Sequence, residues 1–211
     1  MNHSEGTHIL SVANQKGGVG KTTTTINLAT ALSAVDKKVL IIDLDAQGNA
    51  STGLGISAED RRLSTYDLIS ENAELKKIIK QTVVNNLFIA PATTDLSAAD
   101  IEMSANDKRT MVLRKTLEQF LQTEDNFDYV IIDCPPALSL LTINAFVASH
   151  SVLVPLQAEF FALEGLSQLL LTIKEVRSNL NNNIKIHGVV ITMYDKRNNL
   201  SVQIEDDVRY N

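Results

Sequence analysis

Several residue types are scarce in this sequence of 211 residues, and each scarcity excludes a class of protein. There is one cysteine, Cys134, which excludes an intramolecular disulfide framework and any zinc or iron–sulfur site that takes two thiolates from one chain. No apolar run reaches the roughly 18 residues that a transmembrane helix needs. No charged-then-apolar secretory pattern opens the sequence, so we expect a cytosolic protein.

The overall composition is that of a globular protein. Hydrophobic residues make up 44% of the chain and charged residues 21%, which argues against a disordered chain, a collagen-like fibre or a long coiled coil. At roughly 150 residues per domain, the length fits one good-sized domain. The 19 Lys and Arg against 25 Asp and Glu give a net charge of −6. This balance argues mildly against a surface coated with phosphate contacts, but it leaves room for a local basic patch.

Short apolar runs rich in Val and Ile recur along the chain. Such runs, without polar alternation, are typical of strands buried on both faces of a parallel sheet. We expect strands at residues 8–13, 39–44, 87–90, 129–132, 151–156 and 184–193.

Stretches with helical spacing lie between these runs. We expect helices at residues 22–34, 108–121 and 161–180, and an amphipathic helix at 200–211. The alternation predicts an α/β fold, a doubly wound and mainly parallel sheet flanked by helices, in a single domain over residues 1–211. The charged segments 60–62 and 71–80 are expected to be solvated surface. His150 and His187 flank strands without a partner pattern, so we expect structural roles for both.

Residues 14–23 read NQKGGVGKTT, between an expected strand and an expected helix. This is the context that a phosphate-binding loop needs. Gly17, Gly18 and Gly20 lack a Cβ, so the backbone can turn tightly and direct several N–H groups at one anion. The N-terminus of the following helix adds its dipole to that anion site.

Two side chains complete the expected phosphate site. Lys21 supplies a compact positive charge for the β- and γ-phosphates of a nucleotide, and the Thr22 hydroxyl is placed to bind Mg²⁺. The standard P-loop pattern requires glycine where Gln15 stands, and a second lysine, Lys16, stands at the loop entrance. The sequence therefore predicts a phosphate loop with a variant pattern.

Three aspartates end expected strands. Asp43 and Asp45 close the second run, and Asp133 closes the fourth after a string of apolar residues, as a Walker B aspartate does. Ligands of open α/β sheets bind at the carboxyl ends of the strands, the same edge as the phosphate loop. Carboxylates there can hold Mg²⁺ or its waters and can orient an attacking water. Cys134 follows directly and is expected to be a small core residue rather than a nucleophile.

The loop KGGVGKTT resembles that of the deviant Walker A class of P-loop ATPases, which includes MinD, ParA and the nitrogenase iron protein. In that class the extra lysine, here Lys16, reaches across a dimer interface to the nucleotide of the partner subunit. Residues 43–51 are similar to the ParA-type switch segment D-x-D-P-Q-G-N-A-[ST], with Ala46 where proline is usual, a change that alters loop stiffness rather than chemistry. The resemblance implies that Asp45 orients water and that Asp43 acts near the metal.

Two further segments extend the resemblance to the ParA/Soj branch, so that it covers nearly the whole chain. They are PLQAEFFALEGL at 155–166 and TMYDKRNNLS at 192–201. The first implies that Glu159 contacts the nucleotide and the partner subunit. The implied catalytic residues are Lys16, Lys21 and Asp45, and the implied metal ligands are Thr22, Asp43 and Asp133. The implied nucleotide-binding residues are Lys16, Gly17, Gly18, Val19, Gly20, Lys21, Thr22, Thr23 and Glu159.

The resemblance implies an ATP-hydrolysing partition protein that uses Mg²⁺. ATP would close a sandwich homodimer that binds DNA without sequence preference, and a ParB-type partner would stimulate hydrolysis and release. Such a protein is cytoplasmic and associated with the nucleoid, with no membrane partner. Neutralisation of DNA phosphates by basic residues suffices for binding without sequence preference. The candidate residues are Lys196, Arg197 and, as the best, Arg209 on the terminal helix. Members of the family typically continue further, so this chain is expected to lack their C-terminal portion.

Three alternatives stand beside this interpretation, and the sequence argues against each of them. One is a MinD-like ATPase that cycles on membranes for division-site placement, which depends on a C-terminal amphipathic helix. The sequences of residues 43–51 and 192–201 favour the ParA type over it. An electron-transfer iron protein needs two cluster cysteines per subunit, whereas Cys134 stands alone. A nucleotide-binding scaffold without hydrolysis would not need the intact set of Lys16, Lys21, Thr22, Asp45 and Asp133.

Overall fold

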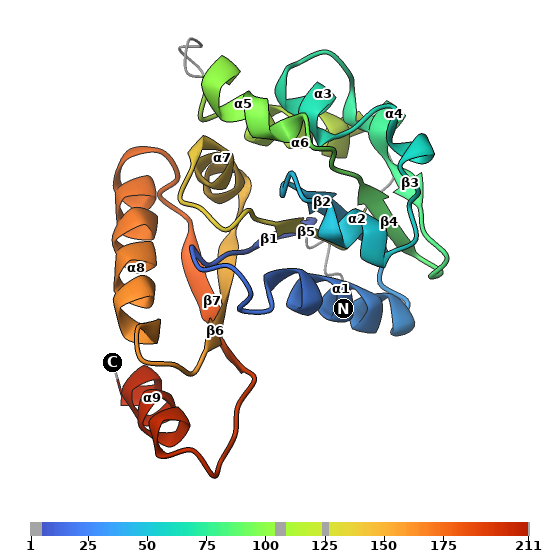
Figure 1. Cartoon of the computed structure of the whole chain (residues 1–211). Coiled ribbons are helices and arrows are strands. Elements are labelled where there is room, and N and C mark those ends of the chain that lie inside the picture. Colours follow the sequence, from blue (N-terminus) through green and yellow to red (C-terminus); the bar gives the residue numbers. More distant parts are fainter. Residues whose placement is uncertain (1–5, 104–108, 124–126, 211) are drawn as a thin grey trace, which may run out of the picture.

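The computed structural model describes residues 6–103, 109–123 and 127–210. A seven-stranded sheet forms its centre, in the order β3-β4-β2-β5-β1-β6-β7 (Figure 1). All six expected strands are present and parallel to their neighbours among these six. They are β1 (His8–Val12), β2 (Val39–Asp43), β4 (Leu87–Ala90), β5 (Tyr129–Asp133), β6 (Ser151–Gln157) and β7 (Lys185–Thr192). The fold class is therefore confirmed, and a short antiparallel edge strand, β3 (Lys80–Gln81), is added to it.

The expected long helices are confirmed. They are α1 (Lys21–Ala34), α6 (Val112–Thr123), α8 (Ala162–Asn179) and α9 (Asn199–Tyr210). Of these, α6 begins later than expected, because residues 109–111 form a turn and a bend instead of helix. Residues 108 and 211, which the sequence assigned to helices, lie outside the described residues. The shorter helices were not predicted: α2 (Asn49–Gly53), α3 (Thr65–Ile69), α4 (Leu75–Ile78), α5 (Leu96–Met103), α7 (Leu140–Ala148) and the 3₁₀ turn η1 (Glu59–Arg61).

The two segments expected to be solvated surface differ from that expectation. Leu75 and Ile78 of α4 are buried against the sheet, because an apolar pair three residues apart occupies one face of a single helical turn. A helix of one turn is too short to produce a periodic signal in the sequence. In the other segment, the Arg61 side chain is half-buried and donates hydrogen bonds to the neighbouring loops.

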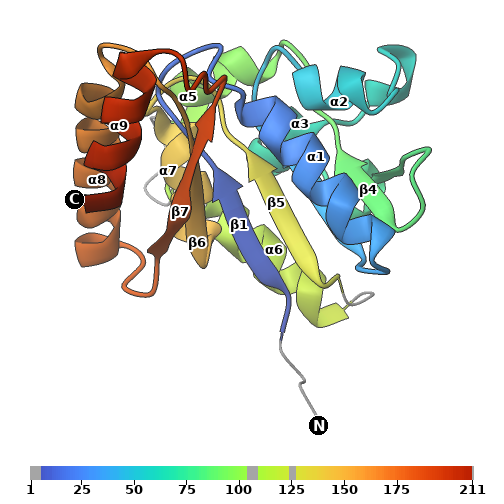
Figure 2. The same cartoon turned by 90° about the horizontal axis from the view of Figure 1, so that it is seen from below.

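Helices cover both faces of the sheet, as a sheet of buried parallel strands requires (Figures 1 and 2). On one face, α3 to α8 pack over Leu40, Ile42, Val130 and other strand residues in the larger core cluster. On the other face, α1 and α2 cover a smaller cluster that includes Ile41. All five residues of β2 are buried. Alternating residues of one strand therefore serve two different cores, which explains its unbroken apolar run.

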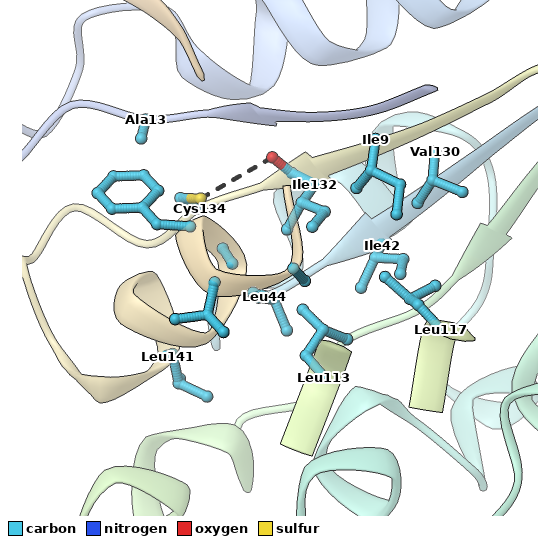
Figure 3. Packing of buried hydrophobic residues seen from close by; sticks show 14 of the residues in the cluster. Ile9, Ala13, Ile42, Leu44, Leu113, Leu117, Val130, Ile132, Cys134 and Leu141 are labelled. Atoms are coloured by element: carbon cyan, nitrogen blue, oxygen red, sulfur yellow. Dashed lines mark hydrogen bonds between the residues drawn. The ribbon is translucent and has the colours of Figure 1, made fainter. Parts of the chain in front are cut away.

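Cys134 lies inside the larger core, as expected. It packs beside Ala13 and Leu44, and its Sγ lies 3.9 Å from the carbonyl oxygen of Ile132 (Figure 3). Burial raises the pKa of the Cys134 thiol, which keeps it protonated and unreactive.

In the described part of the chain, no helix is both long and apolar enough to cross a membrane.

Three histidines meet at the amino ends of β1, β6 and β7, away from the edge that carries the phosphate loop. The His8 ring stacks on His150 with centroids 5.5 Å apart and lies 6.3 Å from His187. The Ile9 N–H donates to His150 Nδ1 at 2.9 Å, which requires that nitrogen to be unprotonated. Burial lowers the pKa of His8, and the neighbouring His150, His187 and Lys185 lower it further.

We predict that His8→Gln weakens the pH dependence of stability. Because the folded-state pKa is depressed, this group contributes stability above the ordinary histidine pKa and loses it as the pH falls. The free energy of unfolding, measured by urea denaturation at about pH 7.5 and about pH 5.5, should fall less for the variant than for the wild type. Ser151→Ala removes the hydroxyl 3.0 Å from His8 Nε2 but keeps the ring, and should retain the wild-type dependence. Equal losses in wild type and His8→Gln would contradict the prediction.

Candidate functional site

The functional residues gather at the carboxyl ends of three adjacent central strands. The strand register pairs Val12 of β1 with Asp133 of β5, and Asp133 with Asp43 of β2. The segments that follow β1 and β2 therefore start at the same edge of the sheet, on either side of β5. This is the edge at which ligands of open α/β sheets bind.

The loop from residue 14 to residue 20 opens α1 through two glycines in the left-handed region. Gly18 has φ of 78°, and Gly20, the N-cap of α1, has φ of 86°. A side chain at either position would strain the backbone. A Cβ placed on Gly17 or Gly18 would meet no atom within 4 Å, so the space over the loop is open. Val19 is buried beneath the loop, and Thr22 and Thr23 lie in the first turn of the helix, with Thr23 exposed.

Two residues that the sequence did not single out hold this loop in place. Asn14 is buried, donates from Nδ2 to the Pro155 carbonyl at 2.8 Å, and accepts from the Lys16 N–H at 3.0 Å. Thr192, at the end of β7, donates to the Val19 carbonyl at 2.9 Å. Thr192 opens the segment 192–201 that carried the family resemblance, and Asn14 lies two residues before the loop KGGVGKTT, which was the available signal. The loop is thus tied to β6 and β7 as well as to its own strand.

Lys21 is the buried cation of the site. Its side chain turns back over the loop, and its ammonium donates to the Lys16 carbonyl at 2.8 Å. Burial lowers the pKa of Lys21, and the nearby Asp133 and Asp45 act in the opposite direction. The lysine is therefore held as a positive charge between the loop and the acidic strand ends, in the position that a phosphate group requires.

Asp133 has a free acceptor that fits a cation. Its Oδ1 accepts from the Thr25 hydroxyl at 3.1 Å, whereas its buried Oδ2 has no hydrogen-bond partner among the described residues. Burial raises the pKa of Asp133 to about 7, and the charge of Asp43 adds to this effect, while Thr22 and Thr25 oppose it. Within the described chain, no group of three or more His, Cys, Asp or Glu could hold a metal by itself. A metal here would take Thr22, phosphate oxygens and waters as ligands beside this carboxylate.

Asp43 is occupied inside the protein. It is fully buried, its Oδ2 accepts from the N–H and the hydroxyl of Ser51 at 2.9 and 2.7 Å, and its Oδ1 accepts from the Asp45 N–H. Burial raises the pKa of Asp43 to about 6. Both oxygens are therefore bound by the segment that follows β2, because the strand buries Asp43 under α2. The role of Asp43 as a metal ligand stays a prediction.

Asp45 lies two residues after Asp43, near the start of the switch segment (residues 43–51). Its side chain is nearly buried, with 9% of its surface exposed. Its Oδ1 accepts from the Gln47 N–H at 3.0 Å, and its carbonyl accepts from the Gly48 N–H at 2.8 Å. These bonds close a tight turn, so Asp45 is held by its own segment, and its second carboxylate oxygen is left for another partner.

Lys16 and Glu159 form an ion pair at the rim of the site. Their side chains are 46% and 30% exposed, so the pair lies at the surface. Beside it is a pocket of about 390 Å³, lined by Gln15, Phe161 and Gly165 among others. Phe160 and Phe161 are 79% and 66% exposed, which is unusual for aromatic side chains.

The three DNA candidates lie around β7 and α9, apart from the phosphate loop. Arg197 is paired with Asp195 at 2.8 Å, and Arg209 is paired with Glu205 at 2.8 Å. Lys196 is exposed and has no ion pair within the part of the chain that the structure describes. The structure therefore brings the nucleotide residues together at one edge, and places the three basic residues on α9 and on the segment between Thr192 and α9.

A glycine loop that joins a strand to a helix, a buried lysine, and carboxylates at the same sheet edge define a P-loop nucleotide-binding protein. Comparison with known proteins agrees with this class. A family model described as "AAA domain" matches residues 7–186. The sporulation initiation inhibitor protein Soj of Bacillus subtilis is 49% identical over 201 residues, which cover 95% of this chain and 78% of that protein. The chromosome partitioning protein ParA of Caulobacter vibrioides is 51% identical, with coverage of 95% and 75%.

Solved structures share the fold of this chain. A cobyrinic acid a,c-diamide synthase from Mycobacterium smegmatis with bound ADP and magnesium has a TM-score of 0.89 and 37% identity, covering 96% of this chain and 81% of that chain. These similarities extend over nearly all of the present sequence. The chain belongs to the ParA/Soj family of P-loop partition ATPases.

We predict that Ser51→Ala destabilises the protein more at high pH than at low pH. The substitution removes the hydroxyl that donates to the buried Asp43 carboxylate, which costs about 2 kcal/mol when that group is ionised. Since the pKa of Asp43 is about 6, the cost should be larger at about pH 8 than at about pH 5. Urea denaturation measures both values. Ser57→Ala, which removes an exposed hydroxyl paired with Asp60, is the control and should change little. A cost that did not depend on pH would contradict this account.

Proposed function

We propose that this chain is an ATP-hydrolysing partition protein that works as a nucleotide-dependent dimer on DNA. The observation that carries the proposal is the pair of lysines at one loop. Lys21 is buried between the loop and the carboxylates of Asp133 and Asp45, and Lys16 stands exposed on the rim. One lysine neutralises phosphates bound by its own subunit, and the other is free to neutralise those of a second subunit.

In the proposed ATP site, the N–H groups of the loop and the start of α1 bind the phosphates. Lys21 neutralises the β- and γ-phosphates, and Thr22 binds Mg²⁺, with Asp133 holding one of its waters through the free Oδ2. The ion would draw charge from the phosphate oxygens. The similar structures that contain ADP or an ATP analogue with magnesium support this choice of ligands.

Asp45 is the proposed water-orienting residue. Its Oδ1 is bound by the Gln47 N–H and its other oxygen is available, so the carboxylate can accept a hydrogen bond from a water in line with the γ-phosphate. Asp43 is proposed as a positioning residue rather than a ligand, because its oxygens bind the backbone of Asp45 and Ser51. Hydrolysis on this account depends on where the switch segment holds Asp45.

Dimerisation requires Lys16 to exchange partners. In the single chain Lys16 is paired with Glu159, and this pair lies at the surface beside the exposed Phe160 and Phe161. Two triphosphates facing each other across a two-fold interface repel strongly unless each receives an additional positive charge. We propose that Lys16 leaves Glu159 for the nucleotide of the partner subunit, and that Glu159 then contacts the nucleotide or the partner at the interface.

The proposed cellular role is the segregation of a chromosome or plasmid by a cytoplasmic, nucleoid-associated protein. Lys196, Arg197 and Arg209 are the proposed contacts to DNA phosphates, and a ParB-type partner is proposed to stimulate hydrolysis. The two partition relatives, at 49% and 51% identity, support this role over that of the diamide synthase, at 37% identity. No observation favours the MinD-like alternative.

The decisive experiment measures ATP hydrolysis alone, with duplex DNA, and with anionic liposomes. Hydrolysis that rises with DNA, or protein that DNA retains only with ATP, supports the proposal. Liposome binding without any effect of DNA would overturn it in favour of the MinD-like alternative. Absence of ATP binding would overturn the enzymatic role altogether.

We predict that Lys16→Ala abolishes dimer-dependent hydrolysis. Loss of a charge that stabilises a phosphoryl-transfer transition state from the partner subunit should lower DNA-stimulated kcat by at least about a hundredfold. ATP binding to the monomer should be nearly unchanged, because Lys21 remains. Lys174→Ala, at an exposed position of α8, is the control. Wild-type hydrolysis by Lys16→Ala would show that the lysine has no such role.

We predict that replacing Lys196, Arg197 and Arg209 together by Ala weakens DNA binding and its dependence on salt. Each lost phosphate contact should reduce the slope of log affinity against log salt concentration by about 0.9. Fluorescence anisotropy with two unrelated duplexes should show the same loss for both, since the contacts are independent of sequence. An unchanged slope would place the DNA surface elsewhere.

A further inference from the structure

The Arg61 guanidinium is anchored with all of its donors in use. Its Nε and Nη2 donate to the Ile56 carbonyl at 3.2 and 2.7 Å, and Nη2 also donates to the Thr52 hydroxyl at 2.8 Å. Its Nη1 donates to the carbonyls of Gly48 and Ala92, both at 3.4 Å. Five N–H groups thus meet four acceptors on α2, on the loop that follows it and on the loop after β4. An arginine that served only solubility would not be bound in this way.

Gly48 shows how closely the guanidinium covers the switch segment. A Cβ on Gly48 would lie 2.6 Å from Arg61 Nη1 and 3.2 Å from the Ala92 carbonyl oxygen. Gly48 also has φ of 60°, so both its backbone conformation and the space above it require glycine. The guanidinium therefore rests on the backbone at the point where the Asp45 turn ends and α2 begins.

A second anchor holds the other side of the same segment. The Ser51 hydroxyl donates to Asp43, and it accepts from the Ala92 N–H at 3.0 Å. Ala92 thus contributes its N–H to the buried anchor and its carbonyl to Arg61. The turn that carries Asp45 is clamped between β2 and these two anchors, and a movement of Gly48 would have to break them.

We propose that Arg61 is a positioning residue that holds the switch segment, and with it Asp45, at the phosphate edge. It sets the rate of hydrolysis rather than the affinity for nucleotide, because it contacts the segment and not the phosphate loop. Ala46 stands where the related segment has proline, so the backbone loses one source of stiffness, and the guanidinium provides another. The inference rests on the proposed role of Asp45.

The test replaces Arg61 by Met, which keeps an unbranched side chain as far as the position of Nε and removes the donors. Relative to wild type, kcat for ATP should fall by about ten- to a hundredfold, as expected when a catalytic group is displaced. KM and the affinity for a fluorescent ATP analogue should stay within about twofold. Arg61→Lys should recover only part of the rate, since an ammonium cannot reproduce the planar fork. Arg62→Met, at the exposed neighbour, is the matched control and should behave as wild type.

Amide hydrogen exchange provides a readout that does not depend on catalysis. In Arg61→Met, exchange should become faster at Gly48 and Ser51, whereas the amides of β1 and β5 keep their protection. Faster exchange throughout the chain would reduce Arg61 to a general stability role and overturn the proposal. Wild-type kcat with unchanged local exchange would also overturn it.

Gly48→Ala approaches the same contact from the other side. The added methyl group would displace the guanidinium and strain the backbone at the positive φ of Gly48, so exchange should rise in the same segment as in Arg61→Met, and the double variant should exchange little faster than Gly48→Ala alone. Asp45→Ala separates this inference from the proposed function. If Asp45→Ala hydrolyses ATP like wild type, the role of Asp45 fails, and exchange at Gly48 still decides whether Arg61 holds the segment. Independent, additive effects of the two substitutions on exchange would overturn the clamp.

Discussion

The parallel register of β1, β5 and β2 is the constraint on which the rest of the site depends. It aligns Val12, Asp133 and Asp43 across three strands, so the phosphate loop and the switch segment leave the same edge of the sheet on either side of β5. The strands are held in that register by burial on both faces, where a shift of one residue would exchange the two cores. The site is therefore positioned by the most buried part of the molecule, and only its loops face outward.

This arrangement concentrates charge at a buried edge. Asp43 and Asp133 are adjacent across β2 and β5, and burial raises the pKa of both. The charge of Asp43 raises the pKa of Asp133 further, and the charge of Asp45 raises the pKa of Asp43. The protein resolves the conflict differently for each carboxylate. Asp43 is satisfied by Ser51 and the Asp45 backbone, whereas Asp133 retains a free oxygen beside Lys21. One carboxylate thus organises a loop, and the other remains available for a cation that would relieve its burial.

The loops around this edge differ in how firmly they are held. The phosphate loop is tied to β6 through Asn14 and to β7 through Thr192, and the switch segment is tied through Ser51 and Arg61. By contrast, Lys16 and Glu159 share a partly exposed ion pair, which contributes little stability and can be exchanged at little cost. The groups proposed for chemistry are thus held firmly, whereas the lysine proposed for dimerisation is paired loosely. This difference is consistent with a protein that assembles in response to nucleotide.

The sequence by itself determined the six parallel strands and the long helices between them. It also determined the phosphate loop, the aspartates at the strand ends and the core role of Cys134. These features are local, since apolar runs, glycines and helix starts act within a few residues. It could not reveal the buried face of α4, because one helical turn carries no periodic signal. Nor could it show that Asp43 is bound by Ser51 while Asp133 keeps an unbound oxygen, or distinguish Arg61 from Arg62. Those differences depend on which groups from distant segments, such as Ser51 and Ala92, lie within hydrogen-bond distance, and only the packed structure decides that.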